Sequence, residues 1–127
     1  MKAMSYRDLD VWRRSMSLVK NIYAITASFP REEIYGLTSQ IRRAAVSIPS
    51  NIAEGHAKRS TKEFHRFCNI SLGSIAELET QLEIAESLNF ANSSTIQPLL
   101  VELSELGKML NALLNGLEKR LSAASFP

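Results

Sequence analysis

The chain has 127 residues, of which 45% are hydrophobic and 22% are charged, and its formal net charge at pH 7 is +2. These values are typical of one soluble globular domain, so we expect a single domain over residues 1–127. A charge this small does not by itself indicate a nucleic-acid partner. No apolar run approaches the ~20 residues that span a membrane, and the N-terminal residues lack a secretory signal, so we expect a cytoplasmic protein without a membrane partner.

Apolar residues recur at three- and four-residue steps in the first half of the chain, which predicts two amphipathic helices. The first covers residues 9–26 and is followed by Pro30, which stops or redirects a helix. The second covers residues 37–55, with an expected bend at Pro49 and an expected end at Gly55. The predicted inner stripe of the first helix is Leu9, Trp12, Met16, Val19, Tyr23 and Thr26, and that of the second is Leu37, Ile41, Ala44, Ile48 and Ile52.

The second half of the chain predicts two further helices. Ser60 and Glu63 have the spacing of a capping box, which marks the start of the third helix. The apolar and small residues of its inner stripe are Phe64, Phe67, Ser71, Ser74, Leu78, Leu82 and Ala85. A polar turn over residues 89–94 precedes a leucine heptad that runs from Ile96 to Leu121. Because no strand pattern competes, we predict an all-α fold, an oligomeric, antiparallel up-down-up-down four-helix bundle.

Polar residues run beside the apolar stripe of the second helix at the same helical spacing. The seam consists of Gln40, Arg43, Ser47, Asn51 and Glu54 on the second helix, and of Gly73, Ser74 and Glu77 on the third. We expect it to be half-buried between helices, within one chain or between copies. Arg43 is expected to reach a carboxylate such as Glu77, and Asn51 to satisfy backbone groups near Pro49. Gly73 is expected to permit a close approach of two backbones, which would offset its low helix propensity.

Basic residues are concentrated in the first half of the chain, where residues 1–66 hold twelve of the fifteen Lys and Arg residues. The candidate nucleic-acid-binding residues are Arg42, Lys58, Arg59, Lys62 and Arg66. Lys62 and Arg66 lie one helical turn apart, and Lys58 and Arg59 precede them at the connection, so one phosphate backbone could bridge them. The alternative is a solvated, charged helix entrance without a ligand.

No catalytic or metal-binding signature is present. Neither histidine follows a glutamate at the spacing of a bundle di-metal site, and His65 and Cys68 lack a second pair of zinc ligands. Cys68 lies in a helical pattern, where a buried thiol acts as a small hydrophobe. We therefore expect a protein that is not an enzyme, with no cofactor and no small-molecule substrate.

Several long motifs resemble those of the 23S rRNA intervening-sequence proteins. These motifs are YGLTSQIRRAA at residues 35–45, SIPSNIAEG at 47–55, KEF at 62–64 and GSIAELETQL at 73–82. The resemblance implies a four-helix protomer that assembles into a ring-shaped homopentamer. It also implies kinship with accessory proteins of diversity-generating retroelements, which bind nucleic acid and a reverse transcriptase.

Two functions remain open at this point. In the first, the chain is an RNA- or nucleoprotein-associated accessory protein whose oligomer presents the basic corner between the second and third helices. In the second, it is a homo-oligomeric scaffold or protein-interaction module that binds no nucleic acid.

Overall fold

The computed structural model describes residues 5–124, and over this range every element of regular secondary structure is a helix. Its elements are the short 3-10 helices η1 (Tyr6–Asp8) and η2 (Arg31–Glu33) and the α-helices α1 (Asp10–Thr26), α2 (Leu37–Ala57), α3 (Thr61–Ser87) and α4 (Ser93–Ala124). The predicted all-α class with four α-helices is thus confirmed for the described residues. None of these helices combines the length and hydropathy that crossing a bilayer requires.

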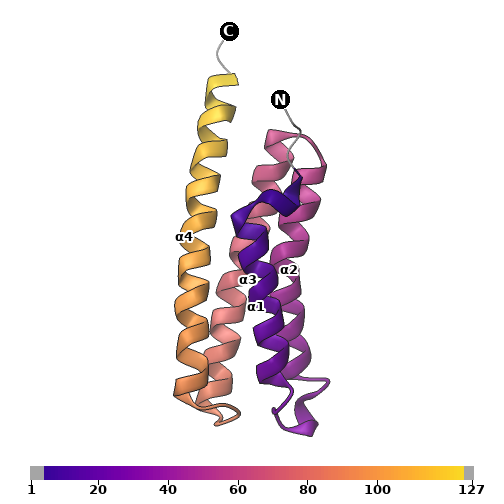
Figure 1. Ribbon diagram of the computed structural model, residues 1–127, viewed down its shortest axis with the longest axis vertical. Coiled ribbons are helices and arrows are strands. Elements are labelled where there is room, and N and C mark those ends of the chain that lie inside the picture. Colours follow the sequence, from indigo (N-terminus) through magenta and orange to yellow (C-terminus); the bar gives the residue numbers. More distant parts are fainter. Residues whose placement is uncertain (1–4, 125–127) are drawn as a thin grey trace.

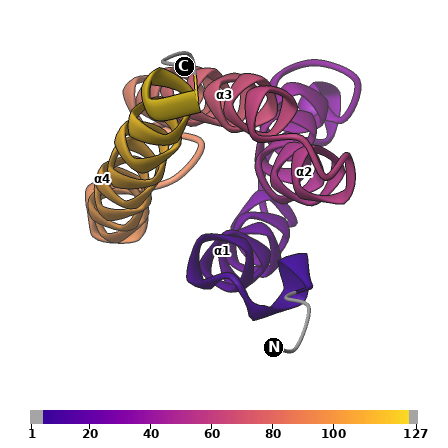
Figure 2. The ribbon, with the colours of Figure 1, turned by 90° about the horizontal axis from the view of Figure 1, so that it is seen from above.

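The four α-helices follow one another around an arc. In Figure 1 the chain descends along α1, climbs along α2, descends along α3 and climbs along α4. The view from above in Figure 2 places α1 and α4 at the two ends of the arc. The α2–α3 contact is the most extensive of the helix pairs, and the α1–α4 contact is much smaller. The α2–α3 pair is therefore the centre of the bundle.

Large aliphatic side chains from all four helices form one core. Its largest fully buried members are Leu18, Ile22, Ile41, Ile48, Ile52, Leu78, Leu82, Ile96, Leu103, Leu106 and Leu110, together with Cys68. Full burial of one such aliphatic side chain contributes about 1.5–3 kcal/mol. Because each helix contributes at least one of these residues, removing any helix would expose the core of the others.

The inner stripe of α1 differs from the predicted one. Met16 and Tyr23 are exposed, whereas Ser15 is completely buried. The buried residues of α1 are Val11, Ser15, Leu18, Ile22 and Thr26. The hydroxyl of Ser15 donates a hydrogen bond to the Trp12 carbonyl at 2.8 Å, which removes the cost of burying it. Polar residues that bond their own helix can enter the core, and a hydropathy pattern does not identify them.

One helix boundary differs from expectation. α2 continues past Pro49, as predicted, but it also continues past Gly55 to Ala57. Gly55 is buried in contact range of Phe67 and does not end the helix. The chain leaves the helix through Arg59, whose φ of 56° lies in the left-handed region. Gly55 therefore serves close packing, and a non-glycine residue makes the turn.

The predicted capping box at the start of α3 forms only in part. The Ser60 hydroxyl accepts a hydrogen bond from the Glu63 amide at 3.2 Å, as predicted. The Glu63 carboxylate does not return to Ser60, because it accepts two hydrogen bonds from Arg66. The reciprocal box is found instead at η1, between Ser5 and Asp8.

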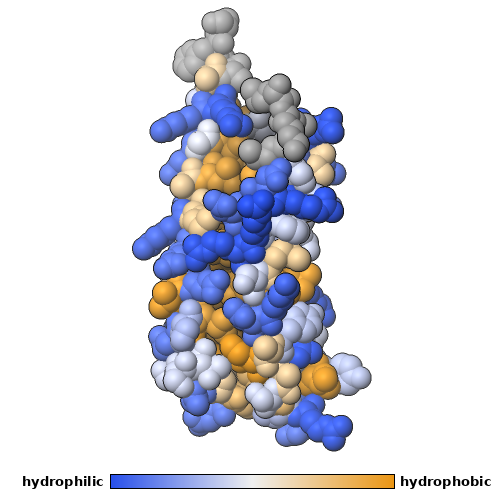
Figure 3. Space-filling model, in the orientation of Figure 1, coloured by the Kyte–Doolittle hydropathy of each residue, from blue (hydrophilic) through white to orange (hydrophobic). Residues whose placement is uncertain are grey.

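Hydrophobic side chains also reach the surface. Figure 3 shows them between hydrophilic residues on the face on which α1 and α4 lie. Over the whole described surface, the large exposed hydrophobic residues are Met16, Tyr23, Ile34, Tyr35, Val46, Ile70, Ile84, Leu88 and Val101. Tyr35, at 96% exposure, is almost completely solvated.

Candidate nucleic-acid interface

The connection between α2 and α3 carries three exposed cations in a short segment, which we call the basic corner: Lys58, Arg59 and Lys62. Lys58 caps the C-terminus of α2, and Lys62 lies in the first turn of α3. Within residues 5–124, none of the three forms an ion pair with a carboxylate. Their charges are therefore available to an anionic ligand.

Arg66 lies one turn further along α3, but its charge is partly neutralised. Its guanidinium donates two hydrogen bonds to the Glu63 carboxylate, at 3.1 and 3.2 Å. The same guanidinium lies 4.4 Å from the centroid of the Phe67 ring, and the Lys58 ammonium lies 5.8 Å from that centroid. The buried Phe67 thus presents a ring face to two cations. Arg66 belongs to the same surface but offers less free charge than the three residues of the basic corner.

The positive charges of the corner act on the carboxylate of Glu63. The pKa of Glu63 lies below its ordinary value of 4.5, first because Arg66 hydrogen-bonds its carboxylate. Desolvation opposes this shift, while the positive charges of Arg66, Lys58 and Lys62 add to it. The three cations therefore act together on a negative group placed among them.

The C-terminal half of α4 contributes a cation to this site that the sequence reading missed. A surface hollow of about 170 Å³ is lined by His56, Arg59, Ser60, Thr61, Phe64, Leu117 and Arg120. A contact of 3.0 Å between His65 Nε2 and Glu118 Oε1 joins α3 to α4 in the same region. Arg120 is far from Arg59 in sequence, and only the path of α4 beside the start of α3 brings them to one hollow. The Lys119-Arg120 pair near the end of the leucine heptad was the available signal.

Arg42 was predicted from the sequence to bind nucleic acid together with the residues of the basic corner, but it lies far from them. Sixteen residues along α2 separate Arg42 from Lys58, which corresponds to about 24 Å of helix. The Arg42 Nε donates a hydrogen bond to Thr26 Oγ1 at 2.8 Å, and its guanidinium lies 4.6 Å from the Tyr23 ring centroid. The prediction that Arg42 belongs to the same nucleic-acid-binding surface as Lys58, Arg59 and Lys62 is therefore corrected: Arg42 is not part of that surface.

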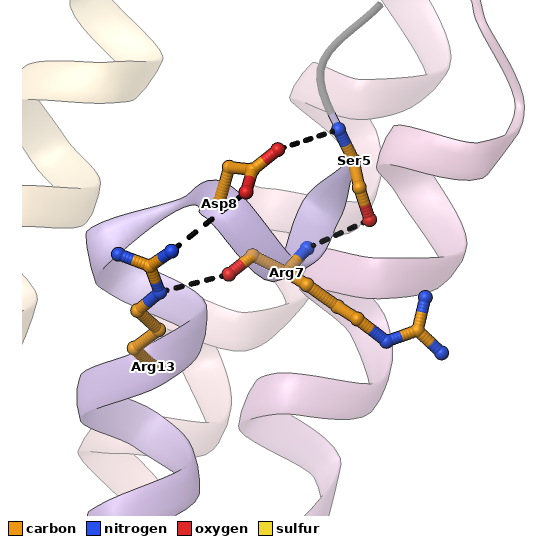
Figure 4. Close-up of polar contacts among 4 residues, drawn as sticks. All are labelled: Ser5, Arg7, Asp8 and Arg13. Atoms are coloured by element: carbon orange, nitrogen blue, oxygen red, sulfur yellow. Dashed lines mark hydrogen bonds and ion pairs between the residues drawn. The ribbon is translucent and has the colours of Figure 1, made fainter.

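Two further arginines of the first helix are engaged in structural contacts. Figure 4 shows Arg13 binding the N-terminal turn, where its Nε donates to the Arg7 carbonyl at 2.9 Å and its Nη2 lies 3.7 Å from Asp8 Oδ1. In the same figure, Ser5 Oγ accepts from the Arg7 amide at 3.1 Å. Arg14 pairs with Glu105 on α4 at 2.7 Å. These contacts fix η1 and α4 to α1.

The middle of the polar seam lies between α2 and α3, half-buried. Ser47 and Ser74 share a hydrogen bond of 2.9 Å. The Asn51 side chain donates to the Ser47 hydroxyl at 2.9 Å and to the Ser47 carbonyl, near Pro49, at 2.8 Å. The Ser71 hydroxyl donates to the Ile48 carbonyl at 2.9 Å. Short polar side chains thus join the two central helices across their contact.

The ends of the seam do not follow the expectation. Gln40, Arg43, Glu54 and Glu77 are all exposed, and Arg43 forms no ion pair with Glu77 within the described part of the chain. Arg43 and Glu77 instead line a shallow hollow of about 270 Å³ with Gln40 and Ser47. At this exposure two long side chains gain little from pairing, which explains the missing bridge.

Gly73 does not mediate the expected close approach within the protomer. A Cβ built on Gly73 would meet no atom within 4 Å. The glycine lies on the exposed side of α3, and its cost in helix propensity is not offset by packing in one chain. The predicted reason for this glycine is therefore wrong for the isolated protomer.

His65 and Cys68, one turn apart on α3, lie in different surroundings. No group of three or more His, Cys, Asp or Glu side chains in the described residues could hold a metal ion. His65 Nε2 contacts Glu118 Oε1 on α4 at 3.0 Å. Cys68 is completely buried, and burial raises the pKa of its thiol to about 12. A thiol in this environment is not a nucleophile at neutral pH.

Comparison with known proteins identifies the family. The family model named 23S rRNA-intervening sequence protein matches residues 7–112. The chain belongs to that family. A crystal structure of a protein with unknown function from the S23 ribosomal protein family of Bacteroides thetaiotaomicron has the same fold, with a TM-score of 0.76 and 22% sequence identity. The similarity covers 82% of this chain and 97% of that one. No curated protein is significantly similar to the chain.

Proposed function

We propose that this 23S rRNA-intervening sequence protein is a non-enzymatic accessory protein that binds RNA or a nucleoprotein through its basic corner. The observation that carries the proposal is the group of three exposed cations, Lys58, Arg59 and Lys62, that no carboxylate within the described chain neutralises. Arg66 and Arg120 extend the surface onto α3 and α4. Such a surface binds phosphates by releasing counterions and needs no base-specific contact.

We further propose that the protomer is an antiparallel up-down bundle that assembles into a homo-oligomer, with the pentamer as the expected state. Exposed apolar residues on α3 and α4, such as Ile70, Ile84 and Val101, support a contact between copies. The open surface at Gly73 would admit a neighbouring backbone there. Assembly also matters for binding, because a few cations per protomer bind weakly and repetition multiplies the contacts.

The binding proposal is tested by titrating fluorescently labelled structured RNA and duplex DNA with protein at two salt concentrations. We expect micromolar binding that weakens steeply with salt. The triple variant Lys58→Gln, Arg59→Gln, Lys62→Gln should lose most of the binding and flatten the salt dependence. Lys20→Gln, Arg31→Gln, Lys108→Gln is the matched control, because it removes the same charge from exposed residues elsewhere. Absent or salt-insensitive binding, or an equal loss in the control, would contradict the proposal.

Arg66→Gln offers a graded test of the same surface. Because Arg66 is already paired with Glu63, its loss should weaken binding less than the loss of Lys62, which has no such partner. An equal or larger loss of affinity in Arg66→Gln would show that unpaired positive charge does not determine the binding affinity.

The second candidate is a homo-oligomeric scaffold or protein-interaction module, which the exposed apolar residues favour by themselves. Mass measurement of the intact complex together with the titration separates the two functions. An assembly of several 14.2 kDa chains that binds neither nucleic acid would support the scaffold.

A further inference from the structure

Helix α1 carries a second apolar stripe that its own chain covers only in part. The stripe follows three- and four-residue steps and consists of Trp12, Met16, Val19 and Tyr23. Residues at these steps share one face of a helix, here beside the buried face. Met16 is 37% exposed and Tyr23 is 44% exposed, whereas Trp12 and Val19 are half-buried. All four belong to the inner stripe that the sequence predicts for α1. An apolar face that stays open in one protomer indicates a contact with another molecule.

The lower end of this stripe forms one wall of a surface hollow of about 380 Å³ between α1 and the start of α2. Tyr23 lines the hollow from α1, Val46 from α2 and Ile34 from the connection, and each is more than a third exposed. Arg42 and Arg43 line the same hollow, and neither forms an ion pair within the described chain. We call this surface the outer groove. It joins aromatic and aliphatic side chains to two arginines, and aromatic residues and arginine are enriched in protein–protein interfaces.

A surface of opposite charge lies where α3 and α4 meet. Leu72 of α3 faces Gly107 of α4, because a Cβ built on that glycine would lie 4.0 Å from Leu72 Cδ1. Glu79 and Glu83 lie about two and three turns further along α3, on the same face as Leu72. Among the described residues, neither carboxylate forms an ion pair. Two uncompensated negative charges therefore lie on the outer side of the α3–α4 pair.

The register of α3 against α4 places an exposed apolar residue beside these carboxylates. Gln97 of α4 donates a hydrogen bond to Glu86 of α3 at 3.0 Å. Because the two helices run in opposite directions, the next turn of α4 lies beside the preceding turn of α3 (Figure 1). Val101, one turn after Gln97, therefore lies near Glu83, and it is 59% exposed. We call this surface the acidic face, and its members are Leu72, Glu79, Glu83 and Val101.

The outer groove and the acidic face lie at the same level of the bundle but on different limbs of the arc. Arg43 lies six residues after the start of α2, and Tyr23 three residues before the end of α1. Glu79 lies eight residues before the end of α3, and Val101 eight residues after the start of α4. All four are thus within about 12 Å of the same end of the bundle. In Figure 2 the α1–α2 pair forms one limb and the α3–α4 pair the other. Within the described chain α1 has no close contact with α3, nor α2 with α4, so the two surfaces do not meet in one copy.

We propose that the outer groove of one copy receives the acidic face of a second copy. This inference rests on the proposed homo-oligomer and assigns the surfaces through which its copies meet. Val101 contacts the apolar wall of the groove, and the carboxylates of Glu79 and Glu83 pair with the two guanidinium groups. A contact between two outer grooves would instead place four arginines opposite one another, and like charges across an interface disfavour association. The charges of the two surfaces therefore select a contact between unlike surfaces.

A contact between unlike surfaces repeats from copy to copy and either closes into a ring or extends as a filament. The two surfaces lie at the same level, so successive copies need no shift along the long axis of the bundle. A closed ring requires this arrangement, and the proposed pentamer is such a ring. The basic corner lies at the opposite end of α2 and stays free in the assembly.

The test is the mass of the complex formed by the full chain, measured by analytical ultracentrifugation over a concentration series. Glu79→Arg, Glu83→Arg reverses the acidic face and should weaken association at least about tenfold, because like charges then oppose each other. Adding Arg42→Glu, Arg43→Glu to the same chain reverses both surfaces and should restore the association. The matched control is Asp10→Arg, Glu54→Arg, which reverses two exposed acids at the opposite end of the bundle and should leave the mass unchanged. Circular dichroism verifies that each variant is folded.

A second rescue pair avoids any damage to the fold. Arg42 also binds Thr26, whereas Arg43 and Glu83 are exposed, so Arg43→Glu combined with Glu83→Arg leaves that bond intact. Each of these two changes alone should weaken association, and the combination should recover most of it.

The outcomes separate this inference from the proposed function. A native chain that stays monomeric would contradict the homo-oligomer itself. A native oligomer whose mass is unchanged by Glu79→Arg, Glu83→Arg, or that neither rescue restores, would overturn only the assignment of these two surfaces. If Arg42→Glu, Arg43→Glu kept the native mass but lost RNA affinity, the outer groove would be a nucleic-acid surface instead. An equal loss of mass in the control would attribute the effect to charge in general.

Discussion

Gly55 of α2 faces Phe67 of α3 so closely that no side chain fits between them. A Cβ built on Gly55 would lie 2.5 Å from the Phe67 Cβ and 3.3 Å from the Phe64 Cδ1. The Phe67 Cβ is bonded directly to the α3 backbone, so it cannot turn aside as the end of a long side chain could. Gly55 thus sets the spacing of the two central helices next to the basic corner.

Gly55→Ala should lower the free energy of unfolding by about 1–3 kcal/mol, because the new methyl group forces α2 and α3 apart. Chemical denaturation measures this directly. The control is Gly73→Ala, where the added methyl meets nothing within 4 Å and improved helix propensity should raise stability by about 1 kcal/mol.

The opposite signs of these two glycine substitutions are the diagnostic feature. If Gly55→Ala were as stable as the native chain, the close contact with Phe67 would not exist in solution. If Gly73→Ala weakened the assembly while stabilising the helix, the open surface of α3 would be part of the contact between copies.

Arg59→Gly should stabilise the chain by about 1 kcal/mol, since Arg59 holds a left-handed φ of 56° that costs a residue with a Cβ about 1–2 kcal/mol. Arg59→Ala is the matched control, because it removes the same charge but keeps the Cβ. Thermal denaturation should rank glycine above both alanine and arginine. Both variants should bind nucleic acid equally weakly, because both lack the Arg59 charge. If only Arg59→Gly lost affinity, binding would depend on the backbone conformation of the turn and not on that charge.

Glu63 should titrate below its ordinary pKa of 4.5 when its carboxylate is followed by NMR. The folded-state pKa is depressed, so the favourable contact with Arg66 is present above the unfolded-state pKa and is lost as pH falls through the folded-state value. Arg66→Gln should raise the midpoint toward 4.5, because the first cause of the shift is removed. Lys20→Gln should leave it unchanged, and an equal change there would indicate a general charge effect.

Cys68 should resist thiol reagents at pH 8 in the native protein, because it is completely buried and burial raises its pKa to about 12. Labelling should become rapid in denaturant, where the thiol is exposed and has its ordinary pKa. Mass spectrometry of the time course measures both rates. Rapid labelling of the native chain would mean that α3 opens locally around Cys68.

Much of the fold follows from sequence periodicity. Most residues of the predicted α3 stripe and of the α4 leucine heptad are buried, because a helical period of 3.6 residues fixes which positions share a face. Phe64, Leu113 and Leu121 are only half-buried, and Leu114, outside the predicted stripe, is buried. The stripe of α1 was misplaced. Ser15 is buried although it is polar, because its hydroxyl bonds its own helix. Met16 is exposed although it is apolar, because α1 lies at the end of the arc and no neighbouring helix covers this residue.

The candidate sites, like the fold, could be predicted from the sequence only in part. The sequence by itself determined the cluster of Lys58, Arg59 and Lys62, because neighbours in the chain are neighbours in space. Only the tertiary structure decided that Arg120 joins this surface and that Arg42 binds Thr26 of α1. The physical reason is that local spacing fixes directions along one helix, whereas the packing of helices decides which charges meet and which remain free.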